Sequence, residues 1–223
     1  CGRLPLKAAA TLAKQALKLN CAAHRAVRRA WRRNGRPLPP LIMMTDAARL
    51  GDPLETLDAL PRGSLVILRD YDHPQRARLA ARLARACRRR GLLLSVAGSG
   101  RLAARIRADG LHLPEGLARR AAAWRSRKEW LITTAAHSLP AIRRAETFGA
   151  DAVLLSPVFP TASHPGGDVL GVLRFARLVR EARLPVYALG GISPGSARRL
   201  NGSGAAGLAG IGVFTPTPHR ERP

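Results

Sequence analysis

Two glycine-containing turns near the carboxyl end of the sequence could hold one phosphate between them. Each follows a short apolar segment of strand type, over 185–189 and 207–211. Glycine lets backbone N–H groups approach an anion closely, and a helix start at Ser193 would add the positive end of its dipole. Two ordinary tight turns are the alternative explanation. The pair of turns predicts a phosphate site made by Gly190, Gly191, Ile211 and Gly212.

The elements that must position these turns alternate regularly from Pro40 onward. Short apolar segments of strand type are separated by segments of helical periodicity. The predicted strands are 41–45, 65–68, 92–96, 109–114 with its turn, 130–134, 152–155, 185–189 and 207–211. Eight strands separated by helices fit a closed parallel barrel better than an open sheet. The predicted fold class is therefore α/β, a (β/α)8 TIM barrel over residues 39–214, in which phosphate sites often form after the last two strands.

The segments on either side of the barrel differ from it in composition. Residues 1–38 contain no acidic residue, and Leu12, Ala16 and Leu19 follow the spacing of one helical face. We predict an extra N-terminal basic amphipathic helix, followed by a Pro-rich linker, that covers the groove between the eighth and first strands. A transit peptide or a surface-binding helix is the alternative. Residues 215–223 cannot readily form a helix, so the last helix is predicted to be missing or truncated.

Composition limits the partners and the compartment. The net charge is +24, which favours anionic ligands, but the scarcity of aromatic residues (4%) disfavours nucleic acid as a partner. No apolar segment is long enough to span a membrane. Three cysteines without a CxxC spacing fit a reducing compartment, so we expect a cytoplasmic protein.

Several short motifs in fixed order resemble the thiamine phosphate synthase and TenI family of thiamine biosynthesis. They occupy residues 45–46, 67–69, 108–113, 136–138, 149–151, 156–161 and 188–192. The resemblance implies a barrel that binds a thiazole phosphate. In the synthase branch, the reaction joins a pyrimidine diphosphate to the thiazole phosphate with magnesium. In the TenI branch, a tautomerase moves a proton and needs no metal.

The positions that would carry the synthase chemistry have lost their polar groups. The resemblance places metal ligands or polar contacts at Gly98, Leu117 and Ala135, and none of these can supply them. We therefore expect a tautomerase-like or catalytically degenerate protein without a cofactor, and Mg2+ only if the alternative of an active synthase holds. A phosphate-ligand sensor or a basic nucleic-acid-binding module is the alternative from another class. Homodimerisation stays open.

His137 is the predicted catalytic residue. It follows the fifth strand and matches the histidine of the family's His-Ser turn, and histidine titrates near neutral pH. A helix-entry histidine bonded to backbone is the alternative. Thr161, Ser163 and Arg69 are expected to line the mouth of the site, and His164 to contact the ligand or lie in solvent.

Overall fold

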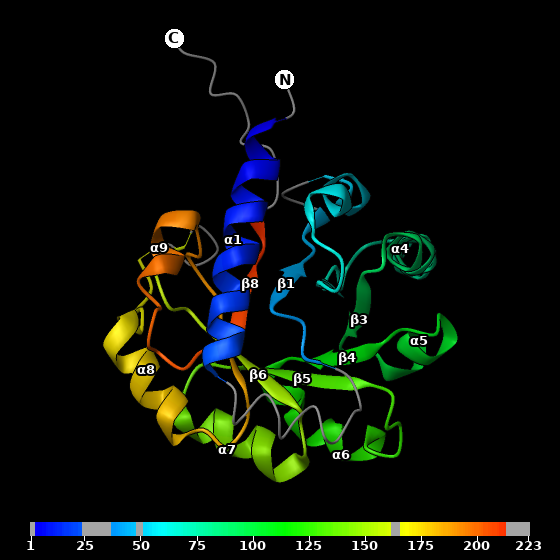
Figure 1. The fold of residues 1–223 in the computed structure, drawn as a ribbon. Coiled ribbons are helices and arrows are strands. Elements are labelled where there is room, and N and C mark those ends of the chain that lie inside the picture. Colours follow the sequence, from blue (N-terminus) through cyan, green and yellow to red (C-terminus); the bar gives the residue numbers. More distant parts are fainter. Residues whose placement is uncertain (1–2, 24–36, 48–50, 162–165, 213–223) are drawn as a thin grey trace.

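The protein forms a closed barrel of eight parallel strands, in the order in which they occur along the chain (Figure 1). The structure is a computed structural model and describes residues 3–23, 37–47, 51–161 and 166–212. The first and last strands close the barrel by pairing Leu41 with Leu208 and Met43 with Gly210. The predicted (β/α)8 fold is confirmed.

The strands lie within two residues of the predicted positions. They are β1 Leu41–Met44, β2 Leu65–Leu68, β3 Leu93–Ala97, β4 Gly110–Leu113, β5 Leu131–Ala136, β6 Ala152–Leu155, β7 Val186–Ala188 and β8 Gly207–Gly210. Almost every strand residue is buried, as expected for a parallel sheet with helices outside and a packed interior. Alternate residues point to opposite sides. In β1, Ile42 packs with the interior cluster around Tyr187, whereas Leu41 packs with the outer helices.

Helical segments connect the strands and cover the outside of the barrel. They are α1 Arg3–Ala22, η1 Pro53–Ala59, α4 Arg76–Arg90, α5 Gly100–Arg105, η2 Glu115–Arg120, α6 Ala121–Trp124, α7 Leu139–Phe148, α8 Gly171–Glu181 and α9 Pro194–Arg198. The helical segment after β4 is a 3-10 helix followed by a single α-helical turn.

Helix α1 lies along the outside of β8 and β1, where the sequence pattern placed it (Figure 1). Leu12 and Ala16 are fully buried there, and Leu19 is nearly so. The side-chain amide of Asn20 donates to the carbonyl of Ala206 just before β8 (2.7 Å), and that of Gln15 donates to Asn201 (2.6 Å). Helix α1 thus fills the groove between the last and first strands.

Two predictions about the ends of the chain lie outside the described residues. The Pro-rich linker and the missing or truncated last helix fall mostly within residues 24–36 and 213–223. These boundaries stay predictions. Within the described part of the chain, no helix is both long enough and apolar enough to cross a membrane.

Candidate active site at the mouth of the barrel

A cavity of about 930 Å³ opens where the strands end. Seven of the nine predicted site residues line it: Arg69, His137, Thr161, Gly190, Gly191, Ile211 and Gly212. Each lies in a loop or turn that follows a strand, which is where (β/α)8 barrels carry their active sites. The other two, Ser163 and His164, lie outside the described residues. The fold therefore brings the described candidates to one cavity.

The turn after β7 has donors available to a ligand. Among the described residues, no acceptor receives the backbone N–H groups of Gly190 and Gly191. Both glycines have positive φ, 94° and 63°. They also pack tightly on the loop after β6: a Cβ added at Gly191 would lie 2.4 Å from the carbonyl oxygen of Pro160. Glycine is thus required here by the fold itself, as well as suited to an anion.

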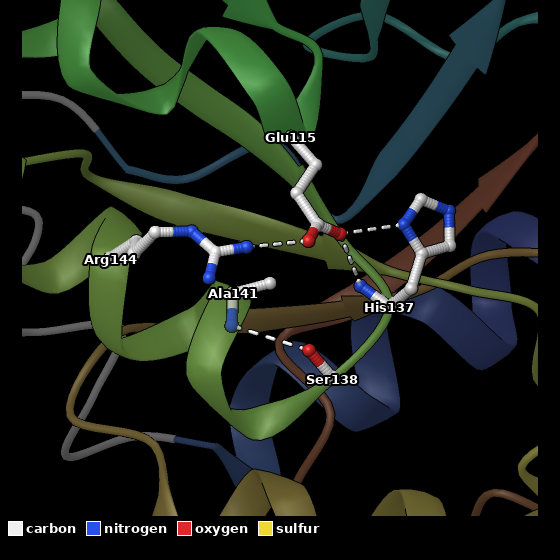
Figure 2. Close-up of polar contacts among 5 residues, drawn as sticks. All are labelled: Glu115, His137, Ser138, Ala141 and Arg144. Carbon is white, nitrogen blue, oxygen red and sulfur yellow. Dashed lines mark hydrogen bonds and ion pairs between the residues drawn. The ribbon is translucent and has the colours of Figure 1, made fainter.

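Three charged or titratable side chains form a connected group after β4 and β5, and two of them, Glu115 and His137, line the cavity (Figure 2). Nδ1 of His137 lies 2.8 Å from Oε2 of Glu115, and the backbone N–H of His137 donates to the same oxygen (3.1 Å). Arg144 donates to the other oxygen, Oε1, at 2.6 Å. Glu115 begins η2, His137 follows β5, and Arg144 lies on α7. The carboxylate therefore links the ends of two neighbouring strands.

Glu115 was missed in the sequence. The resemblance points to position 117, where Leu117 carries no acid, and not to Glu115 two residues earlier. The signal that could have found it is topological. Glu115 follows the fourth strand and His137 the fifth, and consecutive strands of a parallel barrel end side by side.

His112 also reaches the cavity, but from inside the barrel wall. It is buried on β4, and its Nδ1 lies 2.9 Å from the hydroxyl of Thr133. Burial, with a smaller contribution from the charge of Arg69, lowers the pKa of His112 to about 4. The ring is therefore neutral at physiological pH, and it fits the role of a packed histidine that offers one polar edge to the cavity.

Arg69 provides a fixed positive charge at the mouth. Its guanidinium forms an ion pair with Asp46, a nearly buried carboxylate after β1. Its backbone N–H donates to the hydroxyl of Thr45 (3.0 Å), which in turn donates to Asp70. These contacts orient the arginine while leaving about a third of its side chain exposed. The charge is thus available to an anionic ligand.

The acidic side chains near the cavity are poorly placed to hold magnesium. No three His, Cys, Asp or Glu side chains come together as a metal site in the described parts of the chain. Asp46 is paired with Arg69, and Asp70 accepts hydrogen bonds from Thr45 and from the backbone N–H of Ala47. At Gly98, an added Cβ would lie 3.1 Å from the ring of Tyr71. Two acids line the cavity itself: Glu115, which is bound to Arg144 and His137, and Asp168, which belongs to no cluster of three such side chains in the described residues. The described residues therefore do not fit a magnesium-bound diphosphate.

Fold and cavity together define a (β/α)8-barrel protein with a site at the carboxyl ends of its strands. Comparison with known proteins identifies the family. The chain belongs to the thiamine monophosphate synthase family, whose sequence profile matches residues 41–214.

Two named relatives and a solved structure illustrate the similarity. The chain is 34% identical over 182 residues to a protein of Aquifex aeolicus provisionally named thiamine-phosphate synthase 2, covering 79% of this chain and 98% of that one. It is 34% identical to the thiamine-phosphate synthase of Thiobacillus denitrificans, covering 68% and 72% of the two chains. The structure of a thiamine phosphate pyrophosphorylase from Pyrococcus furiosus matches with a TM-score of 0.64 at 25% identity, covering 77% and 85%.

Proposed function

We propose that this protein binds a thiazole phosphate and moves a proton on its ring, as a tautomerase-like member of the thiamine monophosphate synthase family. The observation that carries the proposal is that His137 and the two glycine turns line one cavity. A phosphate on the turns would place the attached heterocycle in that cavity, within reach of a residue able to exchange protons at neutral pH.

The proposed roles follow from the contacts. The backbone N–H groups of Gly190 and Gly191 bind the phosphate, and Arg69 adds positive charge at the mouth. His137 takes a proton from one atom of the ring and returns it to another. The reaction has no leaving group, so it requires neither a magnesium ion nor a second phosphate site. Magnesium is therefore not part of this proposal.

An active synthase is the second candidate, because relatives that match most of the chain carry the name thiamine-phosphate synthase. That reaction releases diphosphate, and metal ions or cations ordinarily neutralise such a leaving group. Asp46, Asp70 and Glu115 are already bound to protein groups, which leaves Asp168 as the other acid that lines the cavity. This arrangement favours the tautomerase over the synthase.

One assay distinguishes the two functions. The protein is incubated with thiazole phosphate tautomer, with and without pyrimidine diphosphate, in magnesium and in chelator, and the products are followed by mass spectrometry and proton NMR. We expect tautomer interconversion that is insensitive to chelator and no thiamine phosphate. Magnesium-dependent formation of thiamine phosphate would instead show that the protein is a synthase. Binding of thiazole phosphate without any turnover would favour a phosphate-ligand sensor.

The phosphate position is tested best at Ser193. Substitution of Gly191 itself is unsuitable, because a side chain there would collide with Pro160. Ser193 lines the cavity and caps α9, and Asp and Asn are equally good caps. We expect Ser193→Asp to weaken thiazole phosphate binding at least about tenfold, since it places a negative charge beside the phosphate. Ser193→Asn, the neutral control, should bind nearly as well as the wild type in calorimetry. Equal affinity of the two variants for thiazole phosphate would contradict the placement of the phosphate at this turn.

A further inference from the structure

Both oxygens of the Glu115 carboxylate accept hydrogen bonds, and they do so from opposite sides. Oε1 accepts from Arg144, and Oε2 accepts from the backbone N–H of His137 and faces its Nδ1 (Figure 2). An ionised carboxylate has no proton to donate, so the hydrogen between Glu115 and a neutral His137 ring belongs to Nδ1. The identity of the partner thus determines which ring nitrogen carries the proton.

We propose that Glu115 is a positioning residue that holds His137 in the Nδ1–H tautomer and leaves Nε2 as the atom that exchanges protons with the ligand. Among the described residues, no group forms a hydrogen bond with Nε2 of His137. His137 lines the cavity and its side chain is about half exposed, so a bound ligand can reach the ring. The chemical consequence of this inference rests on the proposed function, whereas the tautomer itself does not.

The contacts explain why this partner has to be a carboxylate. A glutamine at position 115 has one oxygen and one NH₂ group, but donors face it from both sides. Either Arg144 or the His137 backbone would then meet an NH₂ group instead of an acceptor. Only a group that accepts at both ends can satisfy Arg144 and His137 together.

Arg144 acts through Glu115 and not on the ligand. It does not line the mouth cavity, but it borders a second cavity of about 490 Å³ on the other side of the Glu115–His137 pair. Its guanidinium fixes the carboxylate by the 2.6 Å contact, and so fixes the plane in which the carboxylate meets the imidazole. Its neighbour Arg143 pairs with Glu146 instead and is equally exposed, which makes it a matched control.

Proton transfer through this arrangement is balanced. One bond between hydrogen and an atom of the ligand ring breaks while an N–H bond forms at Nε2, giving an imidazolium beside the Glu115 carboxylate and an anionic ring. The same Nε2–H then returns its proton to another ring atom, and the imidazole is neutral again. The Nδ1–H bond persists throughout, so no other acid or base is required.

The tautomer is measured directly by nitrogen-15 NMR on the full chain labelled at histidine, with the His137 signals assigned by comparison with a His137→Gln sample. We expect neutral wild-type His137 to carry its proton at Nδ1. In Glu115→Ala and Glu115→Gln, part or all of that population should move to Nε2–H. An Nε2–H tautomer in the wild type, or an unchanged Nδ1–H tautomer in Glu115→Ala, would overturn the inference.

Kinetics supply the second measurement. Because Glu115 orients the base without binding the ligand phosphate, we expect Glu115→Ala to lower kcat for tautomerisation roughly 100-fold with little change in KM. Glu115→Asp keeps a carboxylate and should recover part of kcat, and Arg144→Ala should lower kcat more than Arg143→Ala does. An unchanged kcat in Glu115→Ala would contradict the inference. If the wild type shows no turnover, the proposed function fails, while the NMR result still decides the role of Glu115.

Discussion

The two histidines at the mouth of the barrel have different chemistry because their surroundings differ. His112 is 2% exposed and bonds to a neutral hydroxyl, so its charged form is excluded by burial. His137 is about half exposed and lies against the Glu115 carboxylate. A residue that must repeatedly gain and lose a proton needs the second environment. The distinction favours His137 as the proton carrier and gives His112 a structural role.

The buried His112 should make the protein less stable in mild acid. Its pKa is about 4 in the folded chain and about 6.5 when unfolded, so the unfolded state binds the proton more readily. The neutral ring costs no stability above pH 6.5, and stability is lost as the pH falls from 6.5 towards 4. The difference corresponds to roughly 3 kcal/mol at 1.36 kcal/mol per pKa unit.

Urea unfolding from pH 7 to pH 4 measures this effect. We expect His112→Asn to be less stable than the wild type at pH 7 but to lose much less stability on acidification. His73→Asn, which replaces a partly exposed histidine, should keep the wild-type pH dependence. If His112→Asn and the wild type have parallel pH curves, the acid sensitivity comes from other groups.

The sequence could place His137 but not its partner. A histidine directly after a strand and before a capping serine is visible as a local pattern, and Ser138 does cap α7. The role of Glu115 depends on a contact between residues 22 apart, across two neighbouring strands. Such a contact follows only when strand order and register are known. The hydrogen-bond partner of a histidine ring is therefore the kind of property that local sequence analysis misses.

At the scale of the elements, hydrophobic pattern predicts strands better than the segments between them. A buried parallel strand such as Leu65–Leu68 is a continuous apolar run, and its limits are marked by polar residues on each side. The segment from Glu115 to Trp124 has helical composition, yet forms a 3-10 helix and one α-helical turn. Composition does not distinguish a 3-10 helix from an α-helix over so short a segment.

Helix α1 offers a direct test of an element's contribution to stability. Leu12 is fully buried against the barrel, whereas Leu17 on the same helix is 55% exposed. We expect Leu12→Ala to destabilise the protein by roughly 2–5 kcal/mol, because it leaves a cavity between α1 and the strands. Leu17→Ala should change stability by less than about 0.5 kcal/mol. Urea denaturation measures the free energy of unfolding of both variants. Equal losses of stability would mean that the face of α1 that carries Leu12 does not pack against the barrel.

Considered as a whole, the molecule carries far more positive than negative charge. Lys and Arg number 38 and Asp and Glu number 14, which gives the net charge of +24. Several of the few acids are already paired with arginines, among them Asp46, Asp58 and Glu115. The excess of arginine therefore cannot be neutralised within the chain. Repulsion among like charges opposes the compact state, while the ion pairs favour it.

Added salt shows which of these two electrostatic effects is larger. Raising NaCl from about 10 mM to about 150 mM shortens the Debye length from about 30 Å to about 8 Å. This screens long-range repulsion strongly, and ion pairs at contact distance much less. We therefore expect Tm to rise by several degrees, and to rise less in Arg174→Gln, which removes one exposed positive charge on α8. A Tm that falls with added salt would mean that the ion pairs contribute more to stability than the repulsion costs. The arginines would then stabilise the barrel through their acidic partners.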